Sequence, residues 1–322
     1  MWFVLSILAL LAWSGSDIFS KVGTRQNDKN SHWKVVFAVG LVMGIHFLIT
    51  LIGGSVIDSM GGVDQVPKVV ASLFYTDFVF MDFVRYLPVA ALYILAMVFG
   101  YIGLRYIELS ISSPICNCSG ALAFLLCLIF GIEDEISLPV IIAVVLITVG
   151  IVALGFIENF EDEEAKAARQ EKANRKYAKS FLAFLLPIVY LIIDALGTLG
   201  DEMIFAIEDE AGNGIITDYA ANSAFELTFF LLAVFAFIWI KFVKKDTIFS
   251  GNKHFYLGAT CETIGQVFYM AVMFSDFTEG MVIISAYCAL SVLWGRIFLK
   301  EKLSWKHYAA IATTFVGIVL LG

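Results

Sequence analysis

The fold is decided first by an uncharged and mostly apolar run at residues 138–157, LPVIIAVVLITVGIVALGFI. A helix needs about 20 such residues to cross the hydrocarbon core, so this run predicts one transmembrane span. The run is continuously apolar rather than alternating, which excludes a strand of a membrane β-barrel. Since lipid offers the backbone no hydrogen bonds, the run must be helical.

Runs of the same kind cover most of the chain. Of its 322 residues, 60% are hydrophobic and 16% are charged, against about 45–50% and about 25% in soluble domains. We predict ten spans, at residues 2–22, 33–57, 83–104, 110–131, 138–157, 181–205, 218–243, 254–274, 280–299 and 305–322. The first run has neither a basic segment before it nor a cleavage site after it, so we expect a span rather than a signal peptide. The predicted fold class is an all-α polytopic membrane protein with ten transmembrane helices.

The two halves of the chain resemble each other. A shift of 167 residues pairs Asp134 with Glu301, Ser137 with Ser304, Gly150 with Gly317 and Gly155 with Gly322. A shift of 177 residues pairs segment 13–17 with segment 190–194, each with an aromatic residue one turn before an aspartate. An odd number of spans per copy requires the second copy to insert upside down, as in many secondary transporters. We therefore predict two inverted five-helix repeats, at residues 1–157 and 181–322, joined by a charged cytoplasmic linker at 158–180.

The distribution of basic residues predicts the orientation. Nineteen of the 21 Lys and Arg residues lie in the loops after odd-numbered spans or at the span ends that border them, and only Lys68 and Arg85 lie on the other side. Short loops on the cytoplasmic side of a membrane are enriched in Lys and Arg. We therefore expect a protein of the cell (plasma) membrane with both termini on the extracytoplasmic side. The opposite loops are acidic, which either attracts cations to that face or only reflects the depletion of Lys and Arg.

Two segments carry the pattern of a known family. The segment 13–21, WSGSDIFSK, resembles the tryptophan, small residues and later lysine that open a repeat of the drug/metabolite transporter superfamily. The segment 300–304, KEKLS, is similar to the turn between that superfamily's last two spans, and Gly317 follows it. In the first half the corresponding turn is 132–137, followed by Gly150.

The resemblance is to the EamA-like branch of the superfamily, and it implies ten helices, an inverted repeat and a central cavity. The chain departs from the pattern at Lys300, where the family has glycine, and in the first turn, which lacks a basic residue. Many members are thought to keep both termini in the cytoplasm, whereas the charges here indicate the opposite.

Ionisable residues inside the predicted spans are the first candidates for a site. A charge at the centre of a span costs about 2.5–3.5 kcal/mol on insertion scales and by default marks function. The candidates are Asp17, Asp194, Glu226, Glu262 and His46. For each of them a structural role is the alternative. For Asp17 it is an ion pair with Lys21 or a snorkelling acid, and for Glu226 a rim position. For Asp194, Glu262 and His46 it is a hydrogen bond to a neighbouring helix.

Polar and aromatic residues at helical spacing extend this set. Gln266 and Tyr269 follow Glu262 on one face, and Asn222 precedes Glu226 by one turn. Aromatic rings beside carboxylates suit a cationic head group, and these rings are Trp13 beside Asp17 and Tyr190 beside Asp194. The other polar faces of interest are those of Ser113 with Asn117 and of Tyr287 with Ser291 and Trp294.

These features predict a secondary transporter of a small polar organic metabolite, cationic or zwitterionic, that works by alternating access with a proton or another gradient. A sugar or nucleoside transporter is the alternative, and a membrane sensor or intramembrane enzyme a distant one. No P-loop motif is found, so gradients rather than ATP would drive transport. We expect no enzyme activity, cofactor or metal, and the five cysteines lie in apolar runs as free thiols. Besides the substrate and the lipid bilayer, a homodimer is a possible partner, and nucleic acid is not.

Overall fold

The computed structural model of the protein describes residues 2–24, 28–131, 138–160, 181–209, 212, 214–248, 253–273, 284, 287–301 and 303–321. Its helices are α1 (Trp2–Thr24), α2 (Ser31–Ser59), η1 (Val63–Gln65), α3 (Lys68–Phe74), α4 (Phe80–Gly103), α5 (Leu109–Cys116), α6 (Ser119–Ile129), α7 (Leu138–Phe160), α9 (Phe181–Phe205), α10 (Asp218–Ile238), η3 (Trp239–Val243), α11 (His254–Met273), α13 (Tyr287–Ile297) and α14 (Trp305–Leu321). Within the described residues no β-strand forms, and one isolated bridge joins Glu208 to Gly214. The all-helical fold is thus confirmed.

Six of the described helical segments are long and apolar enough to cross a membrane. They are Phe3–Thr24, Ser31–Ser59, Phe80–Gly103, Leu109–Ile129, Ala183–Phe205 and Asp218–Val243, and a shorter apolar stretch follows at Ile141–Leu154. Helices α7, α11, α13 and α14 occupy the four other predicted spans, so the count of ten spans remains a prediction. The turn at 132–137, most of the linker at 158–180 and part of the span at 280–299 lie outside the described residues.

The fourth predicted span is two helices rather than one. Helix α5 ends at Cys116 and α6 begins at Ser119. Two side chains in the break hydrogen-bond back to carbonyls of α5: Asn117 Nδ2 to Ser113 at 3.1 Å and Cys118 Sγ to Pro114 at 3.0 Å. Pro114 also lacks a backbone N–H, and together these features compete with a continuous helical ladder.

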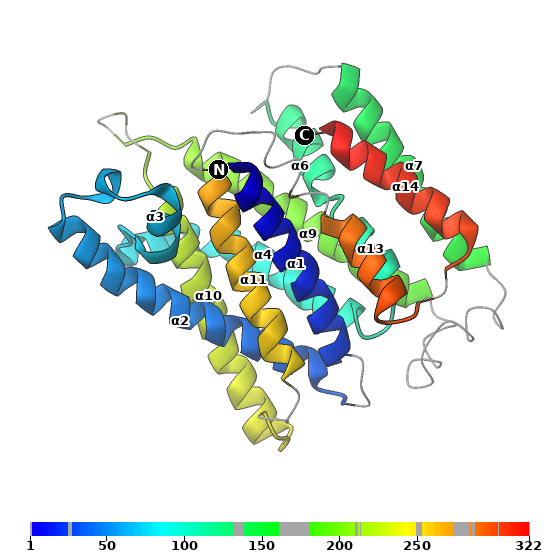
Figure 1. The fold of residues 1–322 in the computed structure, drawn as a ribbon, viewed down its shortest axis with the longest axis horizontal. Coiled ribbons are helices and arrows are strands. Elements are labelled where there is room, and N and C mark those ends of the chain that lie inside the picture. Colours follow the sequence, from blue (N-terminus) through cyan, green and yellow to red (C-terminus); the bar gives the residue numbers. More distant parts are fainter. Residues whose placement is uncertain are drawn as a thin grey trace.

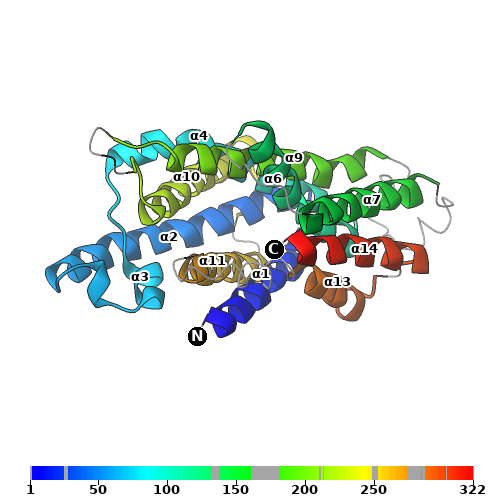
Figure 2. The same cartoon turned by 90° about the horizontal axis from the view of Figure 1, so that it is seen from above.

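Helices from the first half of the sequence pack in pairs against helices from the second half. The pairs are α1 with α11, α4 with α9, α2 with α10, and α7 with α14. In Figure 2, α1, α11 and α13 lie on one side of the molecule and α4, α9 and α10 on the other. Glycines bring several pairs close: a Cβ at Gly40 of α2 would meet the backbone carbonyl of Phe229 in α10. Such close approach is usual between membrane helices.

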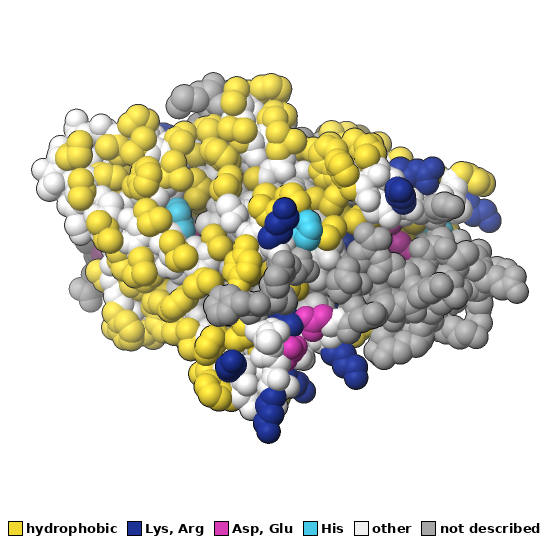
Figure 3. All heavy atoms as spheres, turned by 60° about the horizontal axis from the view of Figure 1, so that its bottom comes forward, with side chains coloured by type: hydrophobic (Ala, Val, Ile, Leu, Met, Phe, Trp, Pro, Cys, Tyr) yellow, Lys and Arg dark blue, Asp and Glu magenta, His cyan; other side chains and the backbone are white. Residues whose placement is uncertain are grey.

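The surface divides into an apolar belt and a basic face. Large apolar side chains are exposed along one face of α2, at Ile45, Leu48, Ile49, Ile52 and Val56, as expected for contact with lipid. Figure 3 turns the bottom of Figure 1 forward and shows the Lys and Arg side chains gathered there. The start of α1 and the end of α14 lie toward the opposite side, the top of Figure 1.

The basic face also holds the contacts that fix the helix ends. Buried Lys34 lies between Asp28 and Asp246, with a Nζ–Oδ2 distance of 3.1 Å to Asp246. Glu301, from the turn that resembles the family pattern, caps α5 by accepting from the backbone N–H groups of Leu109 at 2.9 Å and Ser110 at 3.0 Å. A carboxylate at a helix N-terminus satisfies its free N–H groups and favours its dipole.

Candidate functional site

A cavity of about 370 Å³ lies between the two groups of helices. Its lining includes five carboxylates, which are those of Asp17, Asp194, Asp201, Asp218 and Glu262. Six tyrosines also line it, Tyr86, Tyr93, Tyr101, Tyr190, Tyr269 and Tyr287. None of the described residues that line the cavity is Lys, Arg or His. The cavity is therefore strongly acidic, which favours a positively charged ligand.

One wall of the cavity is the face of α9 that carries Tyr190, Asp194 and Asp201. Asp194 is hydrogen-bonded by the side chains of Ser119 and Tyr190. Asp201 accepts a hydrogen bond on each carboxylate oxygen, from the hydroxyls of Tyr86 at 2.6 Å and Tyr93 at 2.7 Å. The two tyrosines are seven residues apart and lie on one face of α4, so α4 fixes the position of the Asp201 carboxylate.

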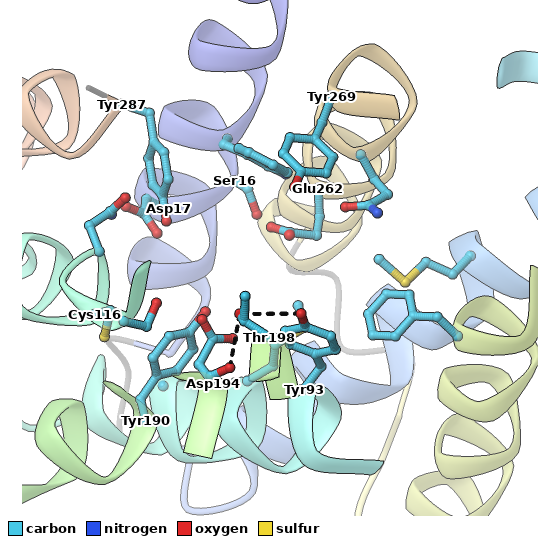
Figure 4. Close-up of a pocket in the computed structure, with 18 of the residues that line it drawn as sticks. Ser16, Asp17, Tyr93, Cys116, Tyr190, Asp194, Thr198, Glu262, Tyr269 and Tyr287 are labelled. Carbon is cyan, nitrogen blue, oxygen red and sulfur yellow. Dashed lines mark hydrogen bonds between the residues drawn. The ribbon is translucent and has the colours of Figure 1, made fainter. Parts of the chain in front are cut away.

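The opposite wall is formed by α1 and α11. Asp17 accepts hydrogen bonds from Ser113 Oγ and Ser291 Oγ, both at 2.6 Å. Glu262 is hydrogen-bonded by the side chain of Ser16. In Figure 4, Asp17 and Glu262 reach into the cavity from α1 and α11, and Asp194 faces them from α9. Three carboxylates from three helices thus converge, and the side chains that hydrogen-bond them within the described residues are hydroxyl groups.

The hydrogen bonds of Asp17 bear on whether it forms an ion pair with Lys21, as the sequence allowed. Its hydrogen bonds come from the predicted polar faces of the fourth and ninth spans rather than from Lys21. The Lys21 ammonium instead donates to the carbonyls of Leu104 and Ile107, beyond the end of α4. Asp17 is therefore oriented toward the cavity.

Aromatic rings cover the carboxylates of the α1 wall. The Trp13 ring lies 5.2 Å from the Tyr269 ring and 5.7 Å from the Tyr287 ring, between centroids. Trp13 fits against α11 because Gly265 leaves room for its indole, which a Cβ there would strike. Tyr190 fits against α4 in the same way, at Gly100. Each aromatic residue that opens a predicted repeat therefore packs on a glycine of the other half.

Two of the predicted site residues lie elsewhere. His46 Nδ1 is 2.7 Å from Glu226 Oε1, between α2 and α10, and neither side chain lines the cavity. A chain of amides links this pair to the cavity: Gln266 Nε2 donates to Asn222 Oδ1 at 3.1 Å, and Asn222 Nδ2 donates to Glu226 Oε1 at 3.3 Å. The interhelical hydrogen bond considered for His46 is thus what the structure shows.

The other nine predicted residues share the cavity lining. They are Trp13, Asp17, Asn117, Tyr190, Asp194, Glu262, Gln266, Tyr269 and Tyr287. Asp201 was not predicted as a site residue, because it lies near the end of the predicted span 181–205. Its signal was the spacing: Tyr190, Asp194 and Asp201 recur at helical intervals on one face. Asp218, Tyr86, Tyr93 and Tyr101 had no comparable signal.

Metal binding has no support among the described residues. No group of three or more His, Cys, Asp or Glu side chains there could hold a metal ion.

Comparison with known proteins identifies part of the chain. Residues 214–322, which hold α10, α11, α13 and α14, match the model of the EamA-like transporter family. No curated protein matches the chain. Over these residues the chain resembles the EamA-like transporter family of the drug/metabolite transporter superfamily, so the resemblance predicted from the sequence is confirmed for this part of the chain, and residues 1–213 lie outside the match.

Proposed function

We propose that this EamA-like membrane protein is a secondary transporter of a small cationic or zwitterionic organic metabolite. The observation that carries the proposal is the cavity with five carboxylates and, among its described lining residues, no basic side chain. Like charges in a poorly solvated site repel one another, and a bound cation relieves that repulsion. The hydroxyl partners of Asp17, Asp194 and Asp201 orient these carboxylates but leave their charge for a ligand to neutralise.

Alternating access between two inverted repeats is the proposed mechanism. Reciprocal contacts support it. Gly150 of α7 lies against residues 310 and 314 of α14, and Gly317 of α14 lies against residues 143 and 147 of α7. These four contact positions correspond under the same 167-residue shift, and the contact is antiparallel. Reciprocity of this kind is what a two-fold axis produces, so the boundaries 1–157 and 181–322 are proposed for the repeats.

The orientation proposed is a basic cytoplasmic face with both termini on the other side of the plasma membrane. The gathering of Lys and Arg on one face, away from the start of α1 and the end of α14, supports it. A periplasmic-type reporter enzyme fused after Gly322 should be active outside the cytoplasm. A fusion active only inside the cell would reject this orientation.

The substrate class is testable on purified protein. Amines, amino acids, sugars and nucleosides are compared for the thermal stabilisation they give, because a ligand stabilises the state it binds. We expect amines or amino acids to raise the melting temperature. Stabilisation by a sugar or nucleoside alone would favour the alternative, for which the lining amides Asn117, Asn222 and Gln266 would serve.

Transport itself is tested with Asp194→Asn in proteoliposomes. The variant keeps the shape of the side chain and its hydroxyl partners, so it should remain folded in detergent while gradient-driven uptake is abolished or uncoupled. Ser55→Ala, on an exposed residue of α2, is the control. Full uptake by Asp194→Asn with an unchanged pH dependence would reject the role of Asp194.

A further inference from the structure

The carboxylates of the cavity fall into two groups. Asp17 of α1 and Glu262 of α11 repel each other, and Asp194 faces both of them from α9 (Figure 4). These three carboxylates form a first acidic subsite. Tyr86 lies within electrostatic range of Asp201 and Asp218, which form a second acidic subsite. Asp194 also repels Asp201, so the two groups adjoin along α9.

The geometry of α9 sets the distance between the subsites. Asp194 belongs to the first and Asp201 to the second, seven residues further along the same helix. At 1.5 Å per residue this separates their backbone positions by about 10 Å. Different partners hold the two carboxylates in place, Ser119 and Tyr190 for Asp194, and Tyr86 and Tyr93 for Asp201.

The first subsite contains a buried hydroxyl that lacks a hydrogen-bond partner. Tyr101 is only 7% exposed, lines the cavity, and finds no hydrogen-bond partner for its hydroxyl among the described residues. It lies within electrostatic range of both Glu262 and Asp17. Since buried polar groups are nearly always hydrogen-bonded, this hydroxyl indicates a place for a ligand.

A primary ammonium group matches the acceptors of the first subsite. It has three N–H donors and no acceptor. The carboxylates of Asp17 and Glu262 and the hydroxyl oxygen of Tyr101 offer one acceptor each. The Trp13 ring beside them adds a face that attracts cations.

The second subsite is held ready for a second cation. The hydroxyls of Tyr86 and Tyr93 already bond both oxygens of Asp201. Each carboxylate oxygen accepts more than one hydrogen bond, so an ammonium group can still be accommodated. Apolar lining residues such as Met97 and Phe225 suit a methylene chain between the two charges.

We propose that the substrate is a dication, an aliphatic diamine or polyamine, whose ammonium groups occupy the two acidic subsites. This inference rests on the proposed transport of cations and narrows its substrate class. A single ammonium group would leave one of the subsites uncompensated, whereas two linked ammonium groups neutralise both.

The test compares cadaverine, a five-carbon diamine, with pentylamine, which has the same chain and one amine, by calorimetric titration of the purified full chain at pH 7. We expect cadaverine to bind at least roughly tenfold more tightly than pentylamine. Asp201→Asn should weaken cadaverine binding by at least roughly tenfold and pentylamine binding by much less, because pentylamine uses the first subsite. Asp218→Asn serves as a second variant if Asp201→Asn does not fold.

Each result of this titration decides between the two proposals. Equal affinities for cadaverine and pentylamine, or an equal loss of both in Asp201→Asn, would overturn the dication and leave cation transport standing. If neither amine binds and the protein still binds a sugar or nucleoside, the proposed function itself is rejected.

Discussion

Two groups of carboxylates inside the long helices differ in what surrounds them. Asp17, Asp194, Asp201 and Glu262 line the cavity, are partly exposed, and accept hydrogen bonds from hydroxyl groups. Glu226 is fully buried at 0% exposure and contacts the imidazole of His46 at 2.7 Å. The sequence offers both as intramembrane acids, but only the cavity group has open space for a ligand.

The difference teaches how to separate a binding carboxylate from a structural one. A carboxylate that contacts an imidazole across a helix interface connects two helices, and its removal should lower the free energy of unfolding. A carboxylate that serines or tyrosines orient toward a cavity has no positive charge beside it. Its removal should weaken ligand binding rather than lower the stability of the fold. Substitutions in the two groups should therefore affect different measurements.

The largest effect is expected at the buried pair. Glu226→Ala should lower the free energy of unfolding in detergent by about 3–5 kcal/mol, because removing one member of a buried pair leaves the other without its partner. The double variant His46→Leu with Glu226→Leu should recover much of this loss, since apolar replacement of both partners is often neutral.

Asp194→Asn is the matched test from the cavity group. It should abolish transport while leaving the free energy of unfolding nearly unchanged. If Asp194→Asn destabilised the protein as much as Glu226→Ala, the distinction between the two groups would fail.

The helices could be predicted from the sequence because long apolar runs are recognisable from composition alone. Residues 138–157 and their counterparts need only length and apolarity to be recognised, and α7 begins at Leu138 as predicted. The break between α5 and α6 was missed because it depends on hydrogen bonds from Asn117 and Cys118 back to α5. Local competition of this kind is not visible in hydropathy.

The site was predictable only as far as single helices reveal it. Helical spacing put Tyr190 and Asp194 on one face, and that face does line the cavity. Spacing could not tell which neighbour a face would meet, so Asn222 and Glu226 looked alike although Asn222 lines the cavity and Glu226 faces His46. The tyrosines that hold Asp201 come from α4, more than 100 residues away in the sequence.

An intermediate effect is expected at Asn222, which connects the two groups. Asn222→Ala removes the hydrogen bonds to Glu226 and from Gln266, and should lower the free energy of unfolding by about 1–2 kcal/mol. Transport should fall, but less than in Asp194→Asn, because Asn222 carries no charge. Thr228→Ala, which removes only a bond to the carbonyl of Ala224 in the same helix, is the control. An effect of Asn222→Ala no larger than that control would show that the amide chain does not couple the groups.

The smallest effect is expected where a carboxylate has a cation and lies outside the membrane-spanning segments. Asp246 accepts a hydrogen bond from the Asn30 side chain at 3.0 Å and pairs with Lys34. The hydrogen bond from Asn30 and then the Lys34 ammonium hold the pKa of Asp246 below its ordinary value. A depressed pKa stabilises the fold above the unfolded-state pKa, and this contribution is lost as the pH falls through the folded-state value. Asp246→Asn should therefore cost about 0.2–1 kcal/mol at pH 7, the range for exposed pairs.

The pH dependence of unfolding separates this charge effect from a loss of packing. As the pH falls through the depressed folded-state pKa of Asp246, the wild-type carboxyl group takes up its own proton. The wild type and Asp246→Asn should therefore converge in stability at low pH. Raising the salt concentration at pH 7 should also narrow the difference, because exposed charges are screened. A difference that persisted at low pH and high salt would assign Asp246 a packing role, and the contrast with the cavity carboxylates would then rest on Glu226 alone.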